Sequence, residues 1–249
     1  MNPSERIAIV IGGSRGIGRV IGTFLAEEGY RVIATSRTQE EEIPFPVEML
    51  DISDKQSVNF FIKRMAQELP YLNVLVNNAG IAGPTAPIDQ VSDEEWDTVF
   101  DVNVRGVFWI TRGLLPLLER APGARRIINI SSMTGKRPLY QRVPYAASKM
   151  AIVGITRSLA LELGSKGITV NAISPGFVKG ERIRNVIAGQ AQASGIHYDE
   201  MNEVFLNQSP LHRLVSPESI AHMVVHLASD FAGDITGCDI SITAGVWMD

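Results

Sequence analysis

Short apolar runs alternate with longer amphipathic segments along the whole 249-residue chain, and this alternation most constrains its fold. We predict the runs as buried strands: Ile7–Ile11, Arg31–Thr35, Val47–Leu50, Val74–Val76, Arg126–Ile130, Thr169–Ile173 and Asp239–Ile242. The segments between them have helical periodicity: Gly16–Glu28, Lys55–Leu69, Asp93–Arg120, Pro144–Gly164 and Pro217–Ala228. This order predicts an α/β protein, with one domain over residues 1–249 and a doubly wound parallel sheet of about seven strands.

Composition and charge exclude several classes of protein. The net charge of −4 argues against a nucleic-acid partner. Cys238 is the single cysteine, which excludes an internal disulfide and a cysteine-built metal site and fits a reducing compartment. His222 and His226 lie four apart outside any HExxH context, so we favour a helix surface and expect no metal. MNPSER lacks a signal-peptide pattern and no apolar stretch reaches about 18 residues, so we expect a cytoplasmic protein without a membrane partner.

The segment 180–215, between the sixth predicted strand and the last helix, does not show the clear pattern of the rest. An insertion of this size is either a substrate lid or an extra packed pair of helices. We favour the lid.

A glycine-rich loop, GGSRGIG at residues 12–18, follows the first predicted strand. Gly12 permits a tight turn, since glycine tolerates positive φ. Gly16 and Gly18 have no Cβ that would keep a pyrophosphate from the backbone N–H groups of the following helix. Alone, the loop is weak evidence for a dinucleotide site, because any junction of strand and helix can use glycine.

The end of the second predicted strand is more informative. In a dinucleotide-binding fold, an acid there selects NAD, whereas a basic residue accepts the 2′-phosphate of NADP. Here the chain reads Ser36-Arg37 without an acid, and Arg15 adds positive charge within the glycine loop. The alternative is two surface arginines; we favour NADP(H), with NAD(H) as the second choice of cofactor.

The stretch YAASK places Tyr145 and Lys149 four residues apart, on one face of a helix. A nearby ammonium lowers the pKa of a phenol and allows it to exchange protons at neutral pH. Ser131 and Ser132 follow an apolar strand, where a hydroxyl can stabilise a substrate oxygen or merely cap a helix. The stretch NNAG at residues 77–80 would line the same edge of the sheet.

The ordered set GGSRGIG, NNAG, ISS and YAASK resembles the short-chain dehydrogenase/reductase (SDR) family, including its 3-oxoacyl-carrier-protein reductases, over about residues 5 to 245. The resemblance implies a Rossmann-type fold and a catalytic tetrad of Asn103, Ser132, Tyr145 and Lys149. Tyr145 would be the acid/base, Ser132 would orient the substrate oxygen, and Asn103 would position a water that links Lys149 to solvent. The family spacing of 13 positions before the tyrosine selects Ser132 over Ser131.

The resemblance also implies the cofactor contacts. Asp51 and Ile52 would hold the adenine, while Val178 would meet the nicotinamide carboxamide. The full set is Gly12, Ser14, Arg15, Gly16, Ile17, Gly18, Ser36, Arg37, Asp51, Ile52, Asn78, Ala79, Gly80, Tyr145, Lys149, Pro175, Gly176 and Val178.

For the substrate we expect walls formed by Met133, Tyr140, Phe177, His197, Tyr198 and Phe205. This mixture does not look like a steroid or long-acyl tunnel, and a hydroxylated or sugar-like ketone is the substrate class we expect. Three arginines could contact an anionic substrate, although we favour solvated loop charges for them: Arg137, Arg142 and Arg182.

Two positions depart from the family pattern. Ile11 replaces a threonine whose side chain braces the glycine loop, so this brace is expected to be missing. Gly180 replaces a threonine after Gly176, so a hydroxyl contact to the cofactor is lost or supplied elsewhere.

The function expected is an NADP(H)-dependent oxidoreductase that interconverts a secondary alcohol and a ketone, acting on a small molecule. The alternatives are an NAD(H)-dependent polyol or sugar dehydrogenase and a non-catalytic nucleotide-sensing protein of the same fold. Such sensors usually lose the tyrosine or the lysine, and both are present here. The family resemblance implies a homotetramer, with the long helices 93–120 and 144–164 in one interface and the last strand in another.

Overall fold

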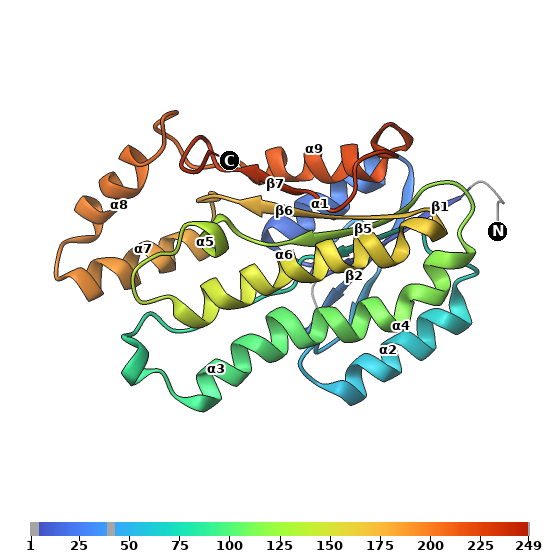
Figure 1. The fold of residues 1–249 in the computed structure, drawn as a ribbon, viewed down its shortest axis with the longest axis horizontal. Coiled ribbons are helices and arrows are strands. Elements are labelled where there is room, and N and C mark those ends of the chain that lie inside the picture. Colours follow the sequence, from blue (N-terminus) through green and yellow to red (C-terminus); the bar gives the residue numbers. More distant parts are fainter. Residues whose placement is uncertain (1–4, 39–42, 249) are drawn as a thin grey trace.

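The computed structural model describes residues 5–38 and 43–248, so the first four residues of MNPSER lie outside the described residues. The chain forms a parallel sheet in the order β3-β2-β1-β4-β5-β6-β7 (Figure 1). The strands are β1 (Arg6–Ile11), β2 (Tyr30–Ser36), β3 (Val47–Met49), β4 (Val74–Asn77), β5 (Arg125–Ile130), β6 (Ile168–Pro175) and β7 (Asp239–Ile242). The predicted seven-stranded, doubly wound α/β fold is confirmed, and every predicted strand is present within two residues of its expected bounds.

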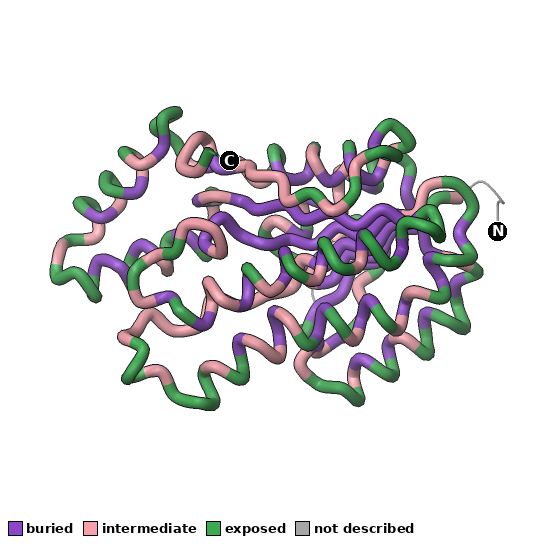
Figure 2. The backbone as a smooth tube through the Cα atoms, in the orientation of Figure 1, coloured by how far each residue is buried: buried purple, intermediate pink, exposed green. Residues whose placement is uncertain are grey.

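Helices cover both faces of the sheet because its strands are apolar on both faces. In β1, Ile7, Ile9 and Ile11 belong to one core cluster, while Ala8 and Val10 belong to the other. The first cluster includes side chains from α2 (Lys55–Glu68), α4 (Gly106–Arg120) and α6 (Val143–Leu163). The second includes side chains from α1 (Gly16–Glu27) and α9 (Pro217–Ala228). Figure 2 shows the buried sheet between these two layers.

The strand order reverses at β1, which sets the position of the site. Val10 pairs with Ala34 of β2 on one side and with Val76 of β4 on the other. Loops that follow neighbouring strands diverge at such a reversal and leave a crevice at the carboxyl ends of the strands. The glycine loop follows β1 directly, so it lies at this crevice.

The predicted helix 93–120 is interrupted. It consists of α3 (Asp93–Phe100), a π-helical turn η2 (Asp101–Arg105) and α4. Ser92 caps α3 in a capping box with Glu95. The π turn inserts one extra residue per turn into the helix and contains the buried Asn103. Sequence periodicity missed the turn because the apolar positions continue through it.

The segment 180–215 contains two helices, α7 (Glu181–Ser194) and α8 (Tyr198–Asn207), beyond the carboxyl ends of the strands (Figure 1). They bury a small third core together with α5 (Met133–Lys136). A bridge between Val178 and Val215 fixes both ends of the segment. The helix-pair alternative therefore describes its secondary structure, while its action as a lid stays a prediction. Short 3-10 turns complete the chain: η1 (Ile88–Gln90), η3 (Gly164–Lys166) and η4 (Asp230–Ala232).

Candidate active site

The glycine loop forms a cradle whose shape depends on the absence of side chains. Gly12 and Gly16 have positive φ values of 74° and 54°. A Cβ on Gly18 would lie 2.1 Å from the carbonyl oxygen of Gly12, whereas a Cβ on Gly16 would point into open space. Arg15, at the N-cap of α1, makes no side-chain cap. No glycine side chain therefore covers the first-turn N–H groups of α1, which is what a pyrophosphate site requires.

The loop is braced by a hydroxyl from the neighbouring strand, which corrects the expectation of a missing brace. The N–H of Gly12 donates to Thr35 Oγ1 at 3.0 Å, and the N–H of Gly13 donates to the Thr35 carbonyl at 3.1 Å. The side chain of Asn78 donates to the Gly12 carbonyl at 2.7 Å. Ile11 itself is 1% exposed and packs in the core. Thr35 of β2 therefore supplies the hydroxyl that Ile11 lacks.

Thr35→Val is expected to destabilise the protein by about 1 kcal/mol, since the Gly12 N–H loses its side-chain acceptor while the side-chain volume is conserved. The Kd values of NADPH and NADH should rise by the same factor, because the loop would bind the pyrophosphate that they share. Urea unfolding and cofactor titration by fluorescence measure the two effects. Thr23→Val, on the exposed side of α1, is the matched control, and equal unfolding midpoints for the two variants would contradict the brace.

The end of β2 places the positive charge of Arg37 near Asp51, a candidate adenine contact. Ser36 is buried and Arg37 is exposed. Burial raises the pKa of Asp51, but hydrogen bonds from Ser53 and the positive charge of Arg37 outweigh it and hold that pKa below its ordinary value. Arg37 and Asp51 therefore lie close enough to interact. Ile52 is buried next to Asp51, and a Cβ on Gly106 of α4 would lie 2.4 Å from its side chain.

Tyr145 and Lys149 lie one turn apart on α6. The Lys149 ammonium is 5.8 Å from the centroid of the Tyr145 ring and donates to the carbonyl oxygen of Ile130 at 2.9 Å. Burial raises the pKa of Tyr145, but Lys149, Arg182, a hydrogen bond with Ser132 and then Arg142 hold it below its ordinary value. Burial also lowers the pKa of Lys149, against the opposing influence of Tyr145. This arrangement favours proton exchange at the phenol.

The two adjacent serines make different contacts. Ser132 interacts with Tyr145 and also caps α5, because its Oγ accepts from the N–H of Thr134 at 3.1 Å. Ser131 donates instead to the Lys149 carbonyl at 2.8 Å and is buried. Ser132 is therefore a helix cap, and it is also the serine whose hydroxyl lies beside the Tyr145 phenol. Its contact with a substrate oxygen stays a prediction.

Asn103 is fixed by a set of hydrogen bonds that sequence reasoning missed. Its Oδ1 accepts from the N–H of Ile81 at 2.8 Å, and its Nδ2 donates to the Ile81 carbonyl and to Ser148 Oγ, each at 3.0 Å. Ser148 in turn donates to the Tyr145 carbonyl at 2.8 Å. The π turn is thereby tied both to the loop after β4 and to α6. Ser148 lies within YAASK, which was the available signal for this contact.

The expectation that Arg142 is a solvated loop charge is wrong. It is 4% exposed, and its guanidinium carbon lies 5.3 Å from the Tyr145 ring centroid. Arg182 is exposed on α7 and donates to the Gly80 carbonyl at 2.6 Å. Arg137 donates to Gln208 at 2.7 Å. No sequence pattern separated these three arginines, because their burial depends on which loops meet.

The predicted substrate walls fall into two groups. Met133, Phe177 and Phe205 are buried in the third core, where the two phenylalanine rings lie 4.5 Å apart. Tyr198 packs against that core and is partly buried. By contrast, Tyr140 is 68% exposed, and the exposed His197 lies at the N-cap of α8.

The chain after β6 runs close to the last strand. A Cβ on Gly176 would lie 2.8 Å from the Cα of Thr243, so only glycine fits between them. Pro175 ends β6, and Val178 forms the bridge to Val215. Gly180 has φ of 152°, and α7 starts without a side-chain cap. Whether another residue supplies the cofactor with the hydroxyl that Gly180 lacks stays a prediction.

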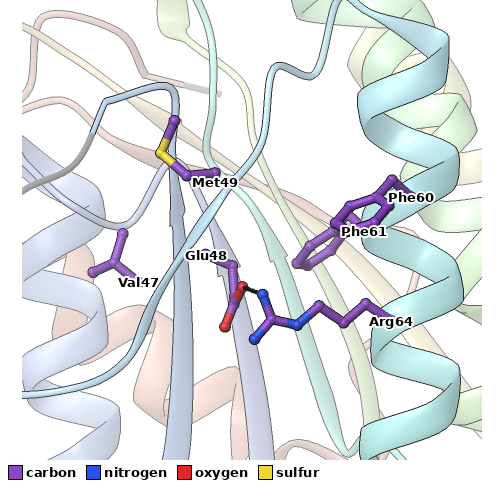
Figure 3. Close-up of a pocket in the computed structure, with 6 residues that line it drawn as sticks. All are labelled: Val47, Glu48, Met49, Phe60, Phe61 and Arg64. Atoms are coloured by element: carbon purple, nitrogen blue, oxygen red, sulfur yellow. Dashed lines mark hydrogen bonds and ion pairs between the residues drawn. The ribbon is translucent and has the colours of Figure 1, made fainter.

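A separate hollow lies at the sheet edge, between β3 and α2 (Figure 3). Figure 3 shows Glu48 and Arg64 pointing toward each other across it, with a 2.5 Å ion pair. None of the candidate site residues lines it.

In the described part of the chain, no three His, Cys, Asp or Glu side chains gather as a metal site, and no helix is both long and apolar enough to span a membrane.

The fold and the cradle beside Tyr145 and Lys149 define a class, the NAD(P)-dependent oxidoreductases. A family model described as enoyl-(acyl carrier protein) reductase matches residues 11–247. An acetoacetyl-CoA reductase of Rhizobium meliloti is 39% identical over 98% of this chain and 99% of its own. A 3-oxoacyl-[acyl-carrier-protein] reductase of Staphylococcus aureus is 37% identical over 97% of this chain and 98% of its own.

A solved structure agrees with these relatives. The actinorhodin polyketide ketoreductase, as a single-residue variant with NADPH, has a TM-score of 0.91 and 31% identity, covering 98% of each chain. This chain therefore belongs to the short-chain dehydrogenase/reductase family, and it resembles the 3-oxoacyl-carrier-protein reductases of that family.

Proposed function

We propose that this protein is an NADP(H)-dependent oxidoreductase that interconverts a secondary alcohol and a ketone, with Tyr145 as the acid/base. The observation that carries the proposal is the position of the Tyr145 phenol, which lies beside Ser132 and Lys149 at the carboxyl end of β5. The homologous reductases and the ketoreductase with NADPH support it.

When bound, NADP(H) supplies or accepts the hydride at the substrate carbon. The chain's residues handle the oxygen and its proton. In reduction, Tyr145 donates its hydroxyl proton to the carbonyl oxygen as the new C–H bond forms, and it takes that proton back in oxidation. Ser132 donates a hydrogen bond to the same oxygen, and Lys149 stabilises the phenolate that remains. The predicted Asn103 water would return a proton through Lys149; Asn103 itself is held by Ile81 and Ser148.

NADP(H) is proposed over NAD(H) because of the charge at the end of β2. Arg37 and Arg15 are both exposed beside the glycine loop and β2. Ser36 and Arg37 occupy the positions where an acid would select NAD. NAD(H) is the alternative cofactor, and an NAD(H)-dependent polyol or sugar dehydrogenase is the alternative enzyme.

Arg37→Ala is expected to raise the Kd of NADPH about tenfold or more and to change the Kd of NADH little, because only NADPH has the 2′-phosphate that the guanidinium would bind. Fluorescence titration with both cofactors measures this. Arg120→Ala removes the same charge from the far end of α4 and serves as the control. Equal losses for the two cofactors would contradict a role of Arg37 in reading the phosphate.

The function is tested by following nicotinamide absorbance with a panel of sugars, polyols, 3-oxoesters and cyclic ketones. Turnover of at least one carbonyl or alcohol is expected, with NADP(H) preferred. Tight NADPH binding without turnover of any compound would favour the nucleotide-sensing alternative instead.

We also propose a homotetramer in a reducing, cytoplasmic compartment. Exposed apolar side chains on α4 and α6, among them Phe108, Met150 and Leu161, support an interface there. Cys238 is exposed and free, which suits a reducing compartment. Light scattering of the purified protein measures the mass, and a monomer would contradict the proposal.

A further inference from the structure

A buried cation without an acidic partner lies beside Tyr145. Two amino groups of Arg142 donate to the carbonyl oxygens of Ala82 and Gly83, at 2.6 and 3.4 Å, and to Thr85 Oγ1 at 2.9 Å. Its Nε is buried and has no hydrogen-bond partner among the described residues. Burying a guanidinium without a negative charge is unfavourable. The site is therefore electrostatically incomplete as the chain alone forms it.

Arg182 brings a second guanidinium to the same place from α7. It donates to the Gly80 carbonyl, and a Cβ on Gly80 would lie 3.4 Å from the Lys149 ammonium. The positive charges of Arg182 and Arg142 both lower the pKa of Tyr145, and each guanidinium also acts on the other, as expected for groups close to one phenol. Within the described residues, neither these arginines nor Lys149 form an ion pair with an acid.

The bonds of Arg182 leave donors available. A guanidinium has five N–H groups, and within the described residues only Nη2 of Arg182 is engaged. Two parallel donors match the two oxygens of a carboxylate. A neutral ester, a thioester or a sugar-like ketone would place no negative charge next to the reacting carbonyl.

We infer that the preferred substrate is an oxo acid (or the corresponding hydroxy acid), whose carboxylate is bound by Arg182 in the field of Arg142. This inference rests on the proposed reductase activity. It departs from the sugar-like ketone expected from the sequence. It also separates this chain from relatives named for thioester substrates, because a thioester has no carboxylate beside its reacting ketone.

The test compares acetoacetate with ethyl acetoacetate, an acid and its neutral ester with the same reacting carbonyl. With NADPH, kcat/KM for the acid should exceed that for the ester by about tenfold or more, the usual gain from a charged hydrogen bond. Arg182→Gln should lower this ratio about tenfold. Arg184→Gln removes the same charge from the same helix at an exposed position and should leave the ratio unchanged.

The outcomes distinguish failure of the carboxylate inference from failure of the proposed reductase activity. An ester reduced as well as the acid, or a ratio that Arg182→Gln does not change, overturns the inference and leaves the reductase intact. Reduction of cyclic ketones or 3-oxoesters without any reduction of acetoacetate overturns it likewise. Failure to reduce any ketone overturns the proposed function. NADPH affinity and the unfolding midpoint of Arg182→Gln verify that the variant is folded.

Discussion

Tyr145→Phe is expected to lower kcat by about 10³-fold while the Kd of NADPH stays within about twofold of the unmodified protein. The substitution removes only the hydroxyl, so the ring keeps its place beside Arg142 and Lys149. The substrate oxygen then has no proton donor in reduction and no acceptor in oxidation. Ser132 remains, but an ordinary serine hydroxyl does not ionise at neutral pH and cannot replace the phenol.

Steady-state kinetics on any active ketone and fluorescence titration of NADPH measure the two quantities. Tyr71→Phe is the control, since its hydroxyl donates to the Glu5 carbonyl at 2.9 Å, near the amino ends of the strands. That variant should keep full activity. Turnover of Tyr145→Phe within about tenfold of normal would assign the proton transfer to another group.

Lys149→Met is expected to lower kcat by about 10²-fold and to move the pH dependence. Methionine fills the buried space of the lysine chain without its charge, so the pKa of Tyr145 rises toward the value set by burial. Reduction needs the protonated phenol and is lost as pH rises through this pKa. Oxidation needs the phenolate, so its rate increases as pH rises through the same pKa. Both limbs should therefore move to higher pH in the variant.

Profiles of kcat/KM against pH in both directions test this sign. Lys166→Met, at an exposed lysine paired with Glu119, should leave both profiles unchanged. If the pH at which kcat/KM changes is the same in Lys149→Met, or is lower, Lys149 does not control the ionisation of Tyr145.

Several parts of the fold and site followed from local sequence. The alternation of apolar runs and amphipathic segments predicted the parallel sheet because each strand is buried on both faces. Gly12, Gly16 and Gly18 predicted the cradle after β1, and the positive φ values of the first two explain why glycine is needed there. The spacing of Tyr145 and Lys149 predicted their common face on α6.

Other parts of the fold and the site could not be predicted from sequence patterns. The brace of the glycine loop comes from Thr35, one strand away, so inspection of Ile11 alone suggested that none existed. The π turn changes the helical phase at Asn103 without interrupting the apolar pattern. The third core required α5, α7 and α8 to meet, and residues 180–215 by themselves gave only a choice between lid and helix pair.

The sequence by itself determined the order of strands and helices, the family and the candidate acid/base pair. These depend on side chains within a few residues of one another, where helix and strand geometry fixes the distances. Only the tertiary structure decided that Arg142 is buried and that Arg182 reaches Gly80 across 102 residues of chain. The effect of a charge depends on its burial and its partners, and both arise only when segments distant in sequence pack together.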